Sequence, residues 1–343
     1  MIRIFNITEA TEWDAVVQSF SEYDVYYLSG YVKAFQIHGD GEPQMLLFEG
    51  SNIRAIYVYM KRKTKIYGVF DSITPYGYGG FLLEGDVSEK NLKEMWAAYE
   101  HKMNEENIVD NFVRYHPVLA NASPMKYCSE VIDMGKTVAM DLASEDVIWT
   151  NIHSKNRNMI RKAEKNGIKI KHGQGLELFD EFIKIYNATM DMNNTEEYYY
   201  FKHEFYKSIH EDLRNNYEMF WAEYEGKIIA MSIMIFANGR LNYHLSGSDI
   251  KYRKMAPSNL LLYKAALWGC EMGMKTLHLG GGVGSCEDNL FQFKIAFNRF
   301  SNFQFSIGKH VFNDRKYKEL VMLHAKERDG FNPENKFFPL YRS

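Results

Sequence analysis

Two stretches of this 343-residue sequence are predicted to form hairpins that follow a pair of helices and precede a helix and a strand. They are QMLLFEGSNIRAIYV, residues 44–58, and EMFWAEYEGKIIAMSI, residues 218–233. Aligned with one gap, they match at Met45 and Met219, Glu49 and Glu223, and Ala55 and Ala230. The repeated order of elements predicts two similar α/β domains, each with a mostly antiparallel central sheet flanked by helices.

Turn and capping residues set the bounds of the expected elements. In the first half we expect an N-terminal edge strand, helices over 8–20 (capped by Thr8), 29–39 and 88–107 (capped by Ser88), a hairpin over 43–62, and strands over 107–116 and 130–142. In the second half we expect helices over 176–192, 201–215, 257–273 and 288–298, a three-stranded meander over 217–248 with turns at Glu225–Gly226 and Asn238–Gly239, and strands over 275–280 and 303–308. The predicted domains are 1–145 and 146–311, with a tail, 312–343, that docks back on the first domain.

Charge and cysteine content exclude several classes of protein. The net charge of −3 gives no bulk attraction for polyanions, so any nucleotide contact needs a local basic patch. Three cysteines, far apart in the sequence, make no disulfide framework, and no spacing of Cys and His fits a metal site. The longest apolar stretch, 228–237, is about half of the roughly 20 residues that a membrane span needs, and no secretory signal opens the chain. We therefore expect a cytoplasmic protein without a transmembrane segment.

The stretch LGGGVGSCEDNLFQFKIAF, residues 279–297, combines a glycine run with one lysine, Lys294. The glycines match neither the dinucleotide fingerprint nor the Walker loop, which favours a strand-to-helix turn over a phosphate cradle. Asp288 is a suitable N-cap, and the helical period then places Lys294 on an apolar stripe with Leu290, Phe293 and Phe297. Its ammonium could reach water along the surface, or face a cleft and stabilise a developing oxyanion.

Two further stretches are candidates for binding. The run from His153 to Gly173 holds seven Lys or Arg residues and one acidic residue, so it could be a solvated helix or a phosphate-binding patch. Lys202 and Tyr206 are expected one helical turn apart, where they could contact a polar ligand or belong to ordinary packing.

Several of these motifs together resemble the FemABX-type aminoacyl transferases. The resemblance rests on residues 241–282 with DNLFQFKIAF (288–297), on HSKNRNMIRKAEKNGIKI (153–170), and on TPYGYGG (74–80) and FFPLYR (337–342). It is clearest between residues 150 and 300. It implies two tandem GNAT-like (acyl-CoA N-acyltransferase-like) domains, and transfer of an acyl group to an amine.

The resemblance also implies roles for individual residues. Phe293 and Lys294 fall on the Phe-Lys pair of the family, whose lysine steadies the tetrahedral intermediate. The implied substrate-binding set comprises Lys202, Tyr206, Tyr243, His244, Ser246, Arg253, Tyr76 and Tyr78. The family more often has arginine at the position of Lys202, and a lysine does not bind phosphate in the same bidentate way.

The resemblance implies an acyl donor that is a co-substrate rather than a resident cofactor. The donor is either an aminoacyl-tRNA, bound through the basic stretch 155–171, or an acyl-CoA. The acceptor is an amine of a nucleotide-linked or lipid-linked cell-envelope precursor. In the wider GNAT superfamily a glycine-containing loop binds the CoA pyrophosphate; here Ala256 replaces that glycine and Pro257 offers no N–H, which favours a carrier other than CoA.

Two alternatives stay open at this point. The first is an acetyl-CoA-dependent N-acetyltransferase that acts on an amino sugar. The second is a catalytically inert binding module on the same fold, which an exposed Lys294 would favour.

Overall fold

The computed structural model describes residues 1–343, and the chain divides into two compact units. The first comprises residues 1–134 and 305–343, and the second comprises residues 135–304. The sequence had placed these boundaries at 145/146 and 311/312, several residues further along in each case. Each unit is described below by itself.

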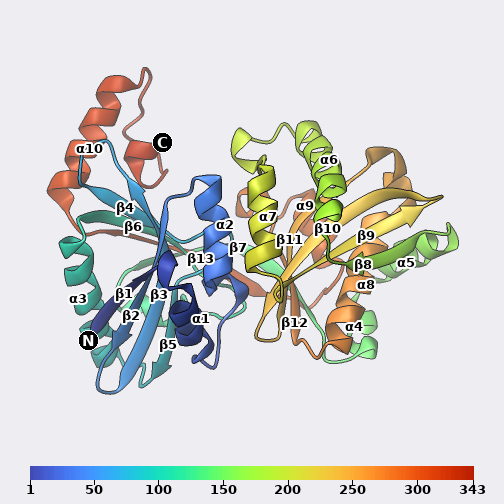
Figure 1. Cartoon of the computed structure of the whole chain (residues 1–343), viewed down its shortest axis with the longest axis horizontal. Coiled ribbons are helices and arrows are strands. Elements are labelled where there is room, and N and C mark those ends of the chain that lie inside the picture. The colour runs from blue at the N-terminus through green and yellow to red at the C-terminus, as the bar shows by residue number, and fades with distance from the viewer. The chain divides into compact units, whose positions relative to one another are not determined.

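The first unit is built on the strands β1-β2-β3-β4-β6-β13, with β5 paired to β3 (Figure 1). Its helix α3 packs on one face of this sheet, and α1 and α2 lie on the other. The strands are β1 (Ile2–Asn6), β2 (Glu42–Glu49), β3 (Ile53–Lys63), β4 (Phe70–Ile73), β5 (Phe81–Gly85), β6 (Ile108–Arg114) and β13 (Phe303–Val311, which begins in the second unit). The helices are α1 (Ala10–Gln18), α2 (Ser29–His38), α3 (Glu89–Glu105) and α10 (Asp314–Glu327).

The second unit is built on the strands β7-β12-β11-β10-β9-β8. Helices α4, α5 and α8 pack on one face of this sheet, and α6 and α7 lie on the other (Figure 1). The strands are β7 (Glu130–Asp141, which begins in the first unit), β8 (Lys169–Gly173), β9 (Tyr217–Tyr224), β10 (Lys227–Ala237), β11 (Arg240–Ser248) and β12 (Thr276–Gly280). The helices are α4 (Glu145–Asn151), α5 (Ser154–Lys165), α6 (Leu176–Met192), α7 (His203–Asp212), α8 (Pro257–Glu271) and α9 (Asn289–Ile295).

The two units share one plan of strand pairing. In each, a run of antiparallel strands leads to a single parallel pair, β4 with β6 in the first unit and β11 with β12 in the second. One more antiparallel strand follows that pair, β13 next to β6 and β7 next to β12. A helix, α3 or α8, lies between the two strands of that pair in sequence, as a parallel connection requires. The predicted pair of similar α/β domains is therefore confirmed.

Local turn chemistry explains why the predicted meander forms. Glu225, Gly226, Asn238 and Gly239 all have positive φ, between 46° and 77°, which suits the two-residue turns of twisted hairpins. Pro257 opens α8, and Gly273 takes a left-handed conformation after it ends. These expectations of the sequence are confirmed.

Three predicted helix ends differ from the structure. The side chain of Asn6, not of Thr8, caps the first helical segment by accepting from the Thr8 amide. Ser88 precedes α3 but makes no capping bond; Asp86 accepts from its amide instead. Helix α9 ends at Ile295 rather than Asn298.

The C-terminal tail packs on the first unit through a buried polar cluster. The Tyr341 hydroxyl lies 2.6 Å from an Asp110 oxygen and 3.0 Å from an Asp71 oxygen, and both carboxyl groups are fully buried. Arg62 donates to Asp71 at 2.7 Å, and Arg342 also pairs with it. Burial, together with the neighbouring Asp71 charge, raises the pKa of Asp110 to about 8. A proton on Asp110 at neutral pH lets the two carboxyl groups lie side by side.

No helix of the chain combines the length and the apolar character needed to cross a bilayer.

The tail cluster predicts a stability effect of Tyr341→Phe. Removing the hydroxyl leaves two buried carboxyl groups without that partner, so the free energy of unfolding should fall by about 1–3 kcal/mol. Urea unfolding followed by circular dichroism measures this. Tyr67→Phe, at a fully exposed side chain, is the matched control. Equal midpoints for the two variants would contradict the role of Tyr341.

Candidate functional site

The glycine run that begins at the end of β12 forms a tight turn, and one of its positions, Gly282, has room only for glycine. A Cβ on Gly282 would lie 2.0 Å from the Cys286 carbonyl oxygen and 2.3 Å from an Asp288 carboxyl oxygen. Gly280 has a φ of 76° and Gly284 a φ of 60°, conformations that favour glycine. The glycines therefore fold the chain back on itself between β12 and α9, and the expected strand-to-helix turn is present.

The ammonium of Lys294 enters this turn. Its Nζ donates to the Gly281 carbonyl at 2.6 Å, and the residue is only 9% exposed. The alternative in which the side chain reaches water is therefore wrong. Phe291 and Phe297 are buried, whereas Leu290, expected on the same stripe as Lys294, is exposed. Phe293 is half-buried and packs edge-on against Phe297, with ring centroids 5.4 Å apart.

Burial changes the acid–base chemistry of this lysine. Removal from water disfavours the charged form and lowers the pKa of Lys294 to about 8, while the nearby Asp288 carboxylate opposes the shift. Near neutral pH most of the population is still the ammonium. A desolvated cation interacts more strongly with a developing negative charge than one in water does.

Asp288 connects the turn to the helix that carries Lys294. Its Oδ1 accepts from the Phe291 amide at 2.9 Å and caps α9, and its Oδ2 accepts from the Val283 amide at 3.3 Å. These backbone hydrogen bonds lower the pKa of Asp288, so that it stays ionised. The sequence identified this residue only as a cap, but it also positions the glycine turn relative to Lys294.

Close to this turn, the parallel pairing of β11 with β12 ends and the two strands separate. Their pairing runs only from Arg240 with Thr276 to Asn242 with His278, although β11 continues to Ser248. Beyond that point the backbone groups of β11 that face β12 have no partner from that strand, and such edges can bind an extended ligand.

Three residues of the predicted substrate-binding set lie on this free part of β11. The pairing of β11 with β10 slips by one residue at His244, which forms a bulge. The Tyr243 hydroxyl and Ser246 hydroxyl are 2.6 Å apart and thus on one side of the strand. Burial lowers the pKa of His244 to about 3, so its imidazole is neutral.

The structure does not bring Lys202 and Tyr206 together as expected. Lys202 precedes α7 as its N-cap residue and is exposed, so it is not one turn away on a helical face. Tyr206 is fully buried, and its ring packs against Phe179 and Phe205. Their roles in binding stay predictions. Arg253 is exposed in the short 3-10 helix Ile250–Met255 that precedes α8.

Tyr76 and Tyr78 belong to the first unit. They lie in the loop between β4 and β5. Tyr76 stacks on Phe35 with ring centroids 5.4 Å apart, and Tyr78 contacts Tyr26 at 5.7 Å. Both residues are half-buried, and their role in substrate binding stays a prediction.

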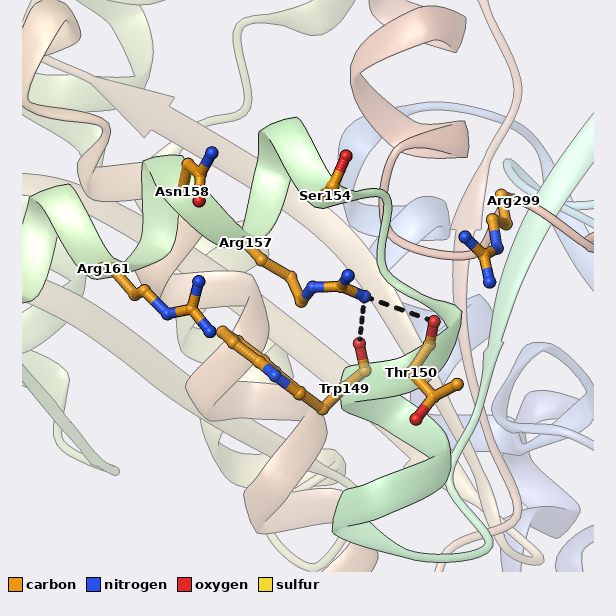
Figure 2. A pocket seen from close by; sticks show the side chains of 7 residues that line it. All are labelled: Trp149, Thr150, Ser154, Arg157, Asn158, Arg161 and Arg299. Carbon is orange, nitrogen blue, oxygen red and sulfur yellow. Dashed lines mark hydrogen bonds between the residues drawn. The ribbon is translucent and has the colours of Figure 1, made fainter.

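The basic stretch 155–171 splits between α5 and β8. Lys171 pairs with Glu223 of β9 at 2.7 Å and is thereby neutralised. Arg157 and Arg161 instead line a pocket together with Trp149 and Arg299, which sequence reasoning did not single out (Figure 2). Nothing in the local sequence indicates that Arg299, well over a hundred residues away, joins them; only the fold brings it there.

A comparison with protein families finds a similarity for the second unit. A family model described as "Acetyltransferase (GNAT) domain" matches residues 153–292. This range includes β11, β12 and the glycine turn, and it ends at Gln292, within α9. Residues 153–292 are therefore similar to this family of domains. The match stops two residues before Lys294, whose helix it enters.

Solved structures extend this likeness to the whole chain. "Crystal structure of FemX" has a TM-score of 0.68 at 15% identity and covers 92% of this chain and 99% of its own. The C-terminal domain (DUF2156) of a putative lysylphosphatidylglycerol synthetase from Agrobacterium fabrum has a TM-score of 0.57 at 14% identity, covering 92% and 94%. A conserved protein of unknown function from Bacteroides thetaiotaomicron VPI-5482 has a TM-score of 0.60 at 11% identity, covering 90% and 99%. Over nine-tenths of its length the chain therefore shares the fold of these structures.

No curated protein matches the sequence of this chain.

Proposed function

We propose that the protein is an N-acyltransferase in which Lys294 stabilises the tetrahedral intermediate. The observation that carries the proposal is the buried ammonium of Lys294, held by the Gly281 carbonyl at the end of a GNAT domain. A buried lysine that serves only the fold would be expected to pair with a carboxylate, but no ion pair of Lys294 is present. Its position also argues against the inert binding module, for which an exposed lysine was expected.

The reaction is the attack of a neutral amine on an activated ester carbonyl. A C–N bond forms, the carbonyl oxygen takes up negative charge, and the Lys294 ammonium donates a hydrogen bond to that oxyanion. The intermediate then collapses, the bond from carbon to the leaving oxygen (or sulfur) breaks, and the leaving group takes the proton that the amine loses. Because the enzyme holds both substrates together, positioning supplies a large part of the rate.

We propose an aminoacyl donor and a cell-envelope acceptor. The support is the FemABX resemblance of the motifs, the FemX-like fold, and the similarity to a domain whose title names a putative lysylphosphatidylglycerol synthetase. The acceptor amine would belong to a cell-wall precursor or to a nucleotide-sugar-linked molecule. Tyr243 and Ser246, on the free part of β11, are the polar groups best placed to contact the substrate.

Lys294→Met should leave the fold intact and lower turnover by roughly 100-fold or more, the scale of losing one oxyanion donor. The methionine keeps most of the side-chain volume, so unfolding should change little. Transfer of a radiolabelled amino acid from aminoacyl-tRNA to a cell-wall precursor measures the rate. Lys275→Met, at an exposed lysine in the same unit, is the control and should be unaffected. Unchanged turnover in Lys294→Met would remove this residue from the mechanism.

The second candidate is an acetyl-CoA-dependent N-acetyltransferase acting on an amino sugar, because the matched family model is one of acetyltransferases. The loop before α8 argues against it. Ala256 has the left-handed conformation that the glycine of a pyrophosphate loop would take, but its N–H already donates to the Arg253 carbonyl at 3.1 Å. Pro257 has no N–H, and the Tyr252 amide donates to Asp249. The positions of Tyr252, Ala256 and Pro257 therefore offer no backbone donor to a pyrophosphate.

Acetyl-CoA should consequently bind only weakly, with a dissociation constant of about 1 mM or higher. Isothermal titration calorimetry with acetyl-CoA, and with desulfo-CoA as a matched ligand that cannot transfer an acetyl group, makes the measurement. Micromolar binding would overturn the preference for an aminoacyl carrier and favour the N-acetyltransferase.

A further inference from the structure

A short segment at the end of the tail, residues 338–343, docks on the first unit through an exposed connection. Helix α10 is followed by the stretch 328–337, most of whose residues are exposed. The segment 338–343 then packs against the unit again, and its Tyr341 is only 6% exposed, in an apolar cluster with Val69 and Val109. This segment can therefore leave the surface while α10 stays folded.

Two buried carboxyl groups bind this segment through one hydroxyl. The Tyr341 hydroxyl oxygen lies 2.6 Å from an Asp110 oxygen and 3.0 Å from an Asp71 oxygen. A hydroxyl has a single proton, so it can donate to only one of the two carboxyl groups. Both contacts are satisfied only when the other carboxyl group carries a proton and donates it to the Tyr341 oxygen.

The contacts with arginine decide which carboxyl group keeps the proton. Arg62 donates to Asp71 at 2.7 Å, and Arg342 also pairs with Asp71. Asp110 forms no ion pair, and its buried Oδ1 has no hydrogen-bond partner. Asp71 is therefore the ionised member of the pair and Asp110 the protonated one. Burial and the neighbouring Asp71 charge, which raise the pKa of Asp110 to about 8, agree with this assignment.

The surroundings of Asp110 do not compensate for its ionisation. The charged and titratable side chains that face it come from β3, β4, α10 and the segment itself, and they are Arg62, Asp71, Tyr317, Tyr341 and Arg342. Both arginines are already held by Asp71. Loss of the Asp110 proton would therefore place a second carboxylate beside the first, with one hydroxyl to serve both. Lifting the segment lets water reach Asp110 and removes this cost.

We propose that the segment 338–343 is a pH-dependent latch, which is docked on the first unit while Asp110 is protonated and lifts more readily once Asp110 ionises. Docked Asp110 holds its proton more tightly than lifted Asp110, because water reaches the lifted carboxyl group. Docking is therefore tightest in acid, weakens as the pH rises towards the docked pKa of about 8, and is level above it. The latch does not depend on the role of Lys294.

Hydrogen exchange of the full chain, followed by mass spectrometry from about pH 5.5 to about pH 8.5, tests the latch. The readout is the protection factor of the peptide that contains residues 338–343, because this ratio removes the intrinsic pH dependence of exchange. It should fall by about tenfold or more, the factor that one unit of pKa difference between the docked and lifted states carries. Asp110→Asn should abolish the fall, since an amide cannot ionise yet can donate to Tyr341. The slope with pH decides, so a variant that docks less tightly at every pH still gives an answer.

Glu94→Gln, at an exposed acidic residue of α3, is the matched control and should keep the fall. His324 of α10 needs its own variant, because its Nε2 lies 3.1 Å from the Ser343 carbonyl oxygen and a histidine can change charge between about pH 5 and pH 8. A fall that persists in Asp110→Asn and disappears in His324→Gln would overturn the role of Asp110. A constant protection factor in the natural protein would overturn the latch, and so would a parallel fall in peptides of α3, which would mean global unfolding.

Discussion

The hydrogen bond from Lys294 to the Gly281 carbonyl is the interaction on which the candidate site depends. It ties α9 to the turn that follows β12, and the ammonium that it holds is buried. Burial lowers the pKa of this ammonium, and the hydrogen bond holds it at the turn next to the opened strand pair, where we propose its oxyanion role. A lysine one residue earlier or later on α9 would point elsewhere, because each residue turns the helix by about 100°.

That hydrogen bond exists because of two features of the backbone around it. Gly282 has no room for a side chain, so the turn can close tightly enough to present the Gly281 carbonyl inward. Asp288 then fixes the start of α9 and accepts from the turn with its other oxygen. The carboxylate also opposes part of the loss of charge on Lys294, so that the lysine remains mostly protonated at neutral pH. Gly282 therefore sets the geometry of the site, and Asp288 contributes to its electrostatics. Both residues are close to Lys294 in the sequence.

Part of the fold and of the candidate site could be predicted, because it depends on residues that are close together in the sequence. The turns at Glu225–Gly226 and Asn238–Gly239 and the Asp288 cap depend on neighbours in sequence, and so the sequence indicated them. For Lys294 the sequence predicted an apolar stripe but left open whether the ammonium reaches water or faces a cleft. The sequence placed Lys202 on the helix, but its backbone is extended and it is the N-cap residue of α7. Arg299 could not be found, since only tertiary packing brings it to α5. The point at which β11 and β12 stop pairing depends on contacts between distant segments, so the sequence of either strand alone does not predict it.

The pH dependence of kcat/KM for acyl transfer tests the central claim most directly, since a lysine of pKa about 8 could act either as an acid or as a base. If the ammonium stabilises the oxyanion, the activity of the natural protein should fall as pH rises through about 8. Lys294→Met should lack that fall and keep only the rise that reflects deprotonation of the acceptor amine. Activity that keeps rising past pH 9 in the natural protein would contradict the account and indicate a neutral lysine acting as a base.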